Sequence, residues 1–156
     1  MGKILRGSPL TYFYTLTAVV FLDLTTKELA EEFLSDRSYE PLPFLKLFLI
    51  YNRGAAFGIF GELPDWIRLP LLITTPLIAF VITYVYTKRS GDGSVAFSMG
   101  LIAGGALGNL YDRFFLGKVR DFIHLHVGDL YWPAFNIADA SITTALLLLL
   151  YRHFRG

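Results

Sequence analysis

Residues 104–141 read GGALGNLYDRFFLGKVRDFIHLHVGDLYWPAFNIADAS, and this stretch joins two strongly apolar segments of the chain. Polar side chains stand at both joins, where lipid tolerates them only at a cost: Asn109, Asp112 and Arg113 at the first, Asn136 and Asp139 at the second. Two carboxylates held together at a membrane surface could hydrolyse a bond, because one can activate a water while the other protonates the departing group. The candidates for that pair are Asp121 and Asp139.

Composition indicates an integral membrane protein of one domain. The chain has 156 residues, of which 54% are hydrophobic, and its mean hydropathy is +0.49. The net charge of +1 gives no reason to expect a nucleic-acid partner. Since the sequence contains no cysteine, a thiol nucleophile and a thiolate metal site are excluded, and any nucleophile must be an oxygen or a water.

Apolar runs predict four transmembrane helices, at about residues 10–28, 67–86, 95–111 and 136–152. The first run could also be a cleavable signal peptide, but no small-residue cleavage site follows it cleanly, which favours a helix. In the third run Gly100, Gly104 and Gly108 recur every four positions, so another helix is expected to approach closely there.

A small β-sheet element is expected on the outer surface between the first two helices, at about residues 40–62. Its apolar run, Phe44 to Tyr51, is less than half the ~20 residues that a helical span needs, and turn residues bound it. The predicted fold class is therefore a mainly α membrane protein with four transmembrane helices and this element. Residues 116–133 are expected to return through water.

Several polar pairs also have a purely structural interpretation. Asp23 and Lys27, four residues apart, are either an ion pair at the membrane edge or a polar contact to the site. Asn136 and Asp139 have the spacing of a helix cap, in which the acid also stabilises the helix dipole. Asp112 and Arg113 are consecutive opposite charges, so they are expected to form a structural pair. Asn109, in the same segment, could position a substrate carbonyl.

His124 and His126 would face the same side of a strand, which raises the question of a metal site. Two histidines without a third ligand at a recognised spacing are weak grounds for one. We therefore expect no metal and no cofactor.

Basic residues fall at alternate connections of the four expected helices: Lys3 with Arg6, Lys88 with Arg89, and Arg152 with Arg155. Basic clusters mark the cytoplasmic side, so both termini are expected there. Asp121 and Asp139 then belong at the outer surface of the membrane.

Three motifs in one order resemble the lipoprotein signal peptidase family, also called signal peptidase II. They are Gly-Asn-Leu-Tyr-Asp-Arg at 108–113, Val-Arg-Asp-Phe-Ile at 119–123 and Phe-Asn-Ile-Ala-Asp at 135–139. Upstream, Asp23 with Lys27 and the run from Asn52 to Gly58 match the remaining motifs of the family in the same order. The resemblance therefore covers nearly the whole chain.

This resemblance implies an aspartic endopeptidase that removes the signal peptide from bacterial prolipoproteins by cleaving before a diacylglyceryl-modified cysteine. Asp121 and Asp139 would be its catalytic pair. The other residues carried over bind substrate or support the site: Asp23, Lys27, Asn52, Arg53, Gly54, Asn109, Asp112, Arg113 and Asn136. It further implies a monomer in the cytoplasmic (inner) membrane whose partners are lipid-modified precursors and membrane lipids.

Other classes compete with this hypothesis. The strings that serine and zinc proteases of membranes require are absent from the sequence. A presenilin-like protease would need Gly-x-Gly-Asp, but His126 stands in place of the first glycine before Gly128 and Asp129. A small channel or carrier remains the alternative, since it also keeps polar residues inside a bundle, although the inverted repeats common in transporters are not evident.

Overall fold

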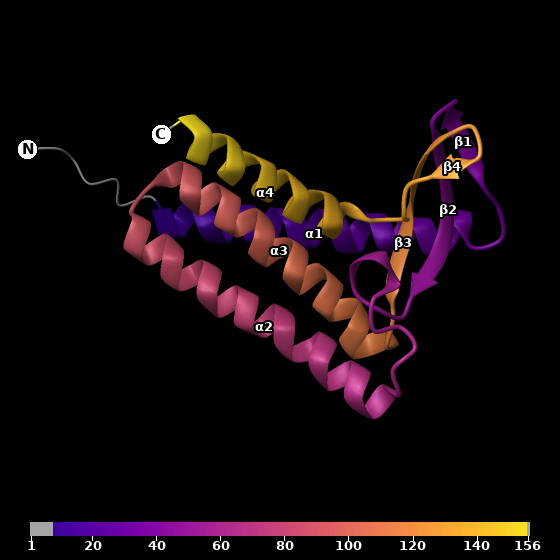
Figure 1. The fold of residues 1–156 in the computed structure, drawn as a ribbon, viewed down its shortest axis with the longest axis horizontal. Helices are drawn as coiled ribbons and strands as arrows, with labels where there is room; N and C mark the ends of the chain where they lie inside the picture. Colours follow the sequence, from indigo (N-terminus) through magenta and orange to yellow (C-terminus); the bar gives the residue numbers. More distant parts are fainter. Residues whose placement is uncertain (1–7, 156) are drawn as a thin grey trace, which may run out of the picture.

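The computed structural model describes residues 8–155, so the expected basic cluster of Lys3 and Arg6 lies outside the described residues. Four helices make up most of the chain: α1 (Ser8–Leu34), α2 (Asp65–Ser90), α3 (Gly93–Leu116) and α4 (Ile137–Arg155). They run alongside one another, and a small sheet stands at one end of the bundle (Figure 1). The chain is therefore mainly helical, as expected.

Helix α3 packs against each of the other three helices, and its small residues allow this. A methyl group at Gly104 would overlap Val19 of α1, and one at Gly108 would overlap the carboxylate of Asp23. The expected close approach at this glycine repeat is confirmed, and its partner is α1. At Gly108 the absence of a side chain leaves room for a buried acid.

The sheet has four antiparallel strands in the order β1 (Tyr39–Leu42), β2 (Leu45–Asn52), β3 (Val119–Val127) and β4 (Leu130–Tyr131). The first two strands confirm the expected element between the first two helices. The other two come from the connection between α3 and α4, which the sequence analysis treated as a return through water. The first four residues of β3, 119–122, are all buried, so the alternation that identifies a half-exposed strand is missing there.

Two of the described helices, α2 and α3, are long and apolar enough to cross a membrane. The outer face of α2 is strongly apolar, with Ile78, Val81 and Ile82 all more than half exposed. Side chains of this kind on an outer face suit contact with lipid. Helices α1 and α4 do not meet the same criteria; α1 carries Asp23 and Lys27 in its interior.

Candidate active site

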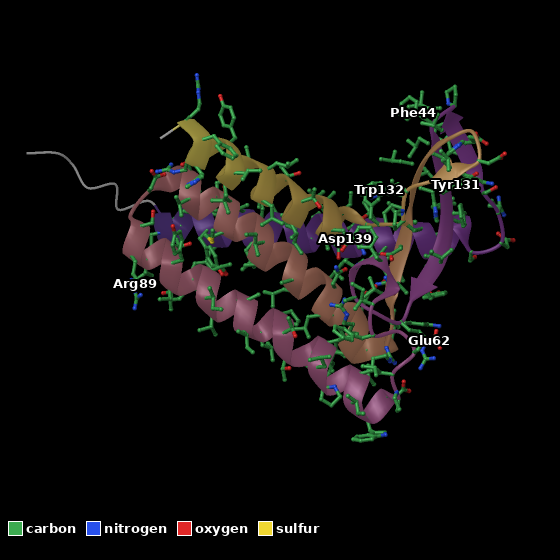
Figure 2. The ribbon with its side chains drawn as sticks, in the orientation of Figure 1. Phe44, Glu62, Arg89, Tyr131, Trp132 and Asp139 are labelled. Atoms are coloured by element: carbon green, nitrogen blue, oxygen red, sulfur yellow. The ribbon has the colours of Figure 1, made fainter. Side chains whose placement is uncertain are left out.

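Asp121 and Asp139 lie where the bundle meets the sheet. Asp121 belongs to β3, and Asp139 belongs to the first turn of α4. An antiparallel bridge between Ile123 and Phe135 holds the segment before α4 alongside β3. Asp139 therefore stands at the end of α4 nearest the sheet (Figure 2).

Asn136 contacts both aspartates. Its side-chain Nδ2 donates to Asp121 Oδ1 at 2.8 Å, and its backbone N–H donates to Asp139 Oδ2 at 3.2 Å. Its Oδ1 in turn accepts from the backbone N–H of Asp139 at 2.9 Å. The last two bonds are the reciprocal cap predicted from the sequence. The cap and the contact to Asp121 coexist, so the structural interpretation of Asn136 does not exclude a functional one.

Asn109 of α3 provides a second link to Asp139. Its Nδ2 donates to Asp139 Oδ1 at 2.9 Å, while its Oδ1 accepts from Lys27 Nζ at 3.0 Å and from Asn136 Nδ2 at 3.1 Å. An ammonium group can only donate hydrogen bonds, so Lys27 fixes which end of the Asn109 amide faces it. The N–H end must then face Asp139.

Asp23 and Lys27 form the expected ion pair, with 2.5 Å between Lys27 Nζ and Asp23 Oδ2 and both side chains fully buried. The other oxygen of Asp23 accepts from the backbone N–H of Ala138 in α4 at 2.8 Å. Buried charges are tolerated when they are paired and hydrogen-bonded, as here. The pair joins α1 to α4 one residue before Asp139, so it lies beside the candidate site.

Asp112 pairs with Arg120 of β3, and the expected pairing of Asp112 with Arg113 is wrong. Arg120 Nη2 donates to Asp112 Oδ1 at 2.9 Å, and the Arg120 backbone N–H donates to Asp112 Oδ2 at 2.9 Å. Neighbouring residues on a helix point in different directions, which explains the error. Arg113 instead reaches the loop after β2, where its Nη2 lies 3.4 Å from the carbonyl oxygen of Gly54.

Asn52, Arg53 and Gly54 begin the loop that follows β2. Asn52 Oδ1 accepts from the Gly54 N–H at 2.8 Å, Asn52 Nδ2 donates to Ala55 O at 3.1 Å, and the Asn52 side chain also hydrogen-bonds Asp121. A methyl group at Gly54 would overlap the backbone of Gly58, so the turn needs glycine. The side chain of Arg53 does not join the site: it is exposed and pairs with an acid at the start of α2.

The Asp121 carboxyl is buried in the site. Its side chain is 2% exposed. Burial and, second to it, the nearby charge of Asp139 together raise the pKa of Asp121 to about 7, against hydrogen bonds from Asn52 and Asn136 that lower it. At neutral pH the site can therefore hold a proton on Asp121.

Two buried arginines near the site, Arg120 and Arg68, were not among the predicted site residues. Besides Asp112, Arg120 contacts Glu28 and Glu31 of α1, at 2.8 and 2.9 Å. Arg68 of α2 donates to the carbonyl oxygens of Arg53 at 2.5 Å and of Gly117 at 2.9 Å, joining the loop to the end of α3. In the sequence, Arg68 is the only charged residue of the apolar run 67–86, and this signal could have identified it.

The two histidines of β3 have protein partners. His124 stacks on Phe48 with 3.5 Å between ring centres, and His126 lies 3.4 Å from a carboxylate oxygen of Glu40. Within residues 8–155 no three His, Cys, Asp or Glu side chains converge in a way that could hold a metal ion. The arrangement that can do chemistry is the carboxyl pair with its asparagines.

Comparison with known proteins identifies similar chains. Residues 15–155 match the family model described as Signal peptidase (SPase) II. The chain is 56% identical over 154 residues to the lipoprotein signal peptidase of Aquifex aeolicus, covering 99% of this chain and 92% of that protein. The corresponding protein of Sulfurihydrogenibium sp. is 46% identical over 145 residues, with 90% and 89% covered. A solved bacterial membrane enzyme superposes with a TM-score of 0.81 at 28% identity, covering 93% of this chain and 88% of that one.

Proposed function

Because the chain belongs to the signal peptidase II family, we propose that Asp121 and Asp139 are the catalytic pair of its active site. The observation that carries the proposal is Asn136, whose side chain and backbone contact the two carboxylates at 2.8 and 3.2 Å. Residues far apart in the sequence meet there in a buried polar cluster, and such clusters occur where chemistry requires them.

The activity is that of the family: an aspartic endopeptidase removes the signal peptide from lipoprotein precursors. Cleavage falls just before the cysteine that carries the diacylglyceryl group. The alternative function, a channel or carrier, does not explain why the chain belongs to the signal peptidase II family.

In the proposed mechanism Asp121 starts protonated and Asp139 starts ionised. Burial and the neighbouring charge favour the proton on Asp121, whose pKa they raise to about 7. Asn109 and the Asn136 backbone donate to Asp139, and hydrogen bonds of this kind stabilise a carboxylate, as does its position in the first turn of α4. In this arrangement Asp121 is the general acid of the pair and Asp139 is the general base.

Proton transfers follow from this division. Asp139 takes a proton from water, whose oxygen attacks the scissile carbonyl carbon, while Asp121 gives its proton to the carbonyl oxygen. The tetrahedral intermediate then breaks its C–N bond. The leaving nitrogen takes the proton from Asp139, and a hydroxyl of the intermediate returns one to Asp121. The pair ends as it began, so no cofactor is consumed.

We further propose four membrane spans, both termini in the cytoplasm and a monomeric enzyme whose site faces the outer leaflet. The basic residues at the α2–α3 turn and at the end of α4 support this orientation. The acidic pair lies at the opposite end of the bundle, where an exported precursor would present its signal segment (Figure 1). Substrate and enzyme would then meet in the plane of the membrane lipids.

The function is tested with purified protein and matched precursor peptides that differ only in the lipid on the cysteine. We expect cleavage immediately before the lipidated cysteine and little cleavage of the unlipidated peptide. Equal cleavage of both would contradict the assignment of the lipidated precursor as substrate.

A further inference from the structure

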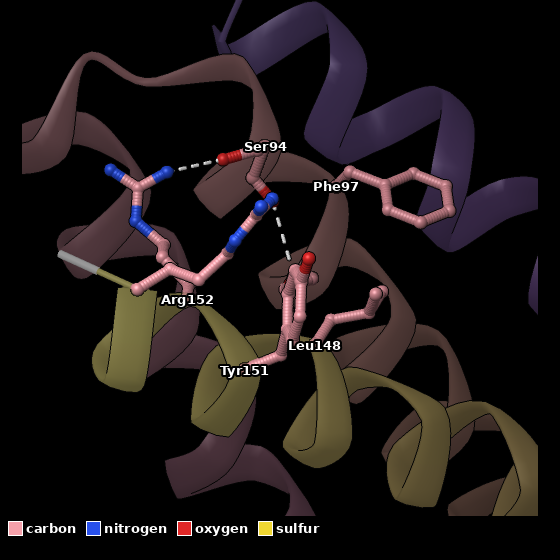
Figure 3. A pocket seen from close by; sticks show the side chains of 7 residues that line it. Ser94, Phe97, Leu148, Tyr151 and Arg152 are labelled. Carbon is pink, nitrogen blue, oxygen red and sulfur yellow. Dashed lines mark hydrogen bonds between the residues drawn. The ribbon is translucent and has the colours of Figure 1, made fainter.

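A cavity of about 580 Å³ lies at the end of the bundle far from Asp121 and Asp139. It is bordered by α3 and α4, near the start of α3 and the end of α4. Its apolar lining consists of Phe97, Leu148 and Tyr151, and its polar lining includes Ser94, Arg152 and Arg155. Figure 3 shows Arg152 bonded to Ser94 at this cavity. We propose that this cavity binds an anionic phospholipid.

The two arginines differ in what they already bind. Arg152 donates to Ser94 Oγ at 2.5 Å and to Asp92 Oδ2 at 2.8 Å, so it ties the end of α4 to the start of α3. Arg155 lies over the ring of Tyr151, with 5.3 Å from its guanidinium carbon to the ring centre. Among residues 8–155 it forms no ion pair, so its donors remain available to a ligand.

The occupant follows from this combination of charge and apolar surface. A guanidinium group with free donors suits a phosphate oxygen pair. Phe97, Leu148 and Tyr151 are 44%, 39% and 59% exposed, which suits an acyl chain against the α3–α4 groove. Basic side chains at the end of a membrane helix are attracted to anionic headgroups. A free phosphate would use the arginine and leave the apolar lining exposed.

The site is separate from the cleavage chemistry, because α3 and α4 run their whole length between it and the sheet (Figure 1). Its ligand would bridge the two helices that carry Asn109 and Asp139 at their other ends. The lipid is therefore a structural ligand of the bundle.

The test uses the full chain reconstituted in nanodiscs with equal amounts of phosphatidylglycerol and phosphatidylcholine, followed by native mass spectrometry of the retained lipids. We expect the wild type to retain phosphatidylglycerol in roughly fivefold excess, the preference that one basic group gives. Arg155→Gln should bring the ratio close to one, and Arg155→Lys should keep most of the excess. Leu148→Trp, which fills the cavity, should reduce retention of both lipids.

Lys88→Gln is the matched control, because Lys88 carries the same charge at the same end of the bundle and does not line the cavity. An unchanged lipid ratio in Arg155→Gln, or an equal loss in Lys88→Gln, would overturn the site. Displacement of the phospholipid by inorganic phosphate would also overturn it, since a site that recognises only the free anion makes no use of the apolar lining.

Discussion

Lys27 of α1 donates a hydrogen bond of 3.0 Å to Oδ1 of Asn109 in α3, and both side chains are buried. The same Asn109 gives its Nδ2 hydrogen to Asp139. Lys27 contacts neither Asp121 nor Asp139, but it determines which end of the Asn109 amide faces Asp139, the proposed base. This makes Lys27 a positioning residue in the proposed site.

Replacing Lys27 by methionine should lower both stability and turnover. The variant leaves Asp23 buried without its partner, which costs about 3–5 kcal/mol in the free energy of unfolding. The double variant Asp23→Asn with Lys27→Met removes both charges, so most of that stability should return, as measured by thermal unfolding. Turnover should stay roughly tenfold low in the double variant, because Asn109 has lost one of the two donors that orient it. Full recovery of turnover would show that Lys27 acts on stability alone.

Cleavage should decline as the pH rises through about 7. The pair works with one proton, which Asp121 holds, and burial with the charge of Asp139 raises the pKa of Asp121 to about 7. Above that pH the proton is lost and no acid remains to polarise the scissile carbonyl. The measurement is kcat/KM against pH with two precursors of different charge, which separates enzyme from substrate ionisation. A rate that is flat up to pH 9 would contradict the role given to Asp121.

Asn52→Ala should weaken turnover while leaving most of the protein folded. The variant loses the bonds from Asn52 to Gly54 and Ala55, at a cost of about 1 kcal/mol each, and its contact to Asp121. That contact lowers the pKa of Asp121, so the alkaline limb of the pH profile should move upward. Arg53→Ala is the neighbouring control, because its side chain is exposed and turned away. Equal activity of Asn52→Ala and Arg53→Ala would show that Asn52 is an ordinary turn residue with no role in cleavage.

Local spacing in the sequence predicted the local contacts of the site correctly. The pair Asp23–Lys27 and the cap formed by Asn136 and Asp139 depend on positions three or four apart, which the helix geometry fixes. Asp112 was assigned to its neighbour Arg113, although its partner lies on the next strand. That pairing depends on how α3 packs against β3, which no local pattern encodes.

Two strands of the sheet were missed for a similar reason. Strand β3 buries Arg120, Asp121 and Phe122 in succession. Helices α1 and α3 both contact this strand, and the segment before α4 pairs with it through a backbone bridge. A strand buried on both faces loses the alternation by which a sequence reveals it. The four helices were each predicted in the right part of the chain, although α1, α2 and α3 extend four to six residues beyond the predicted C-terminal ends.

Reporter fusions test the proposed topology. Asp92 precedes α3, whereas Gly128 lies in the turn between β3 and β4 at the other end of the bundle (Figure 1). A single span separates them, so fusions at the two positions should report opposite sides, with Asp92 in the cytoplasm. If both report the same compartment, the orientation proposed for the site is wrong.

The most direct test replaces Asp121 and Asp139 by asparagine, singly and together, and measures cleavage of a lipidated precursor by the purified variants. Asparagine keeps the shape and removes the acid/base chemistry, so each single variant should lose at least roughly a thousandfold in turnover while remaining folded and able to bind the precursor. The double variant should be hardly worse, because the two groups act as a unit. Asp129→Asn is the control, since Asp129 is exposed in the turn after β3, whereas Asp112 is buried against Arg120 and would disturb the fold. Near-native turnover in either catalytic variant would contradict the account.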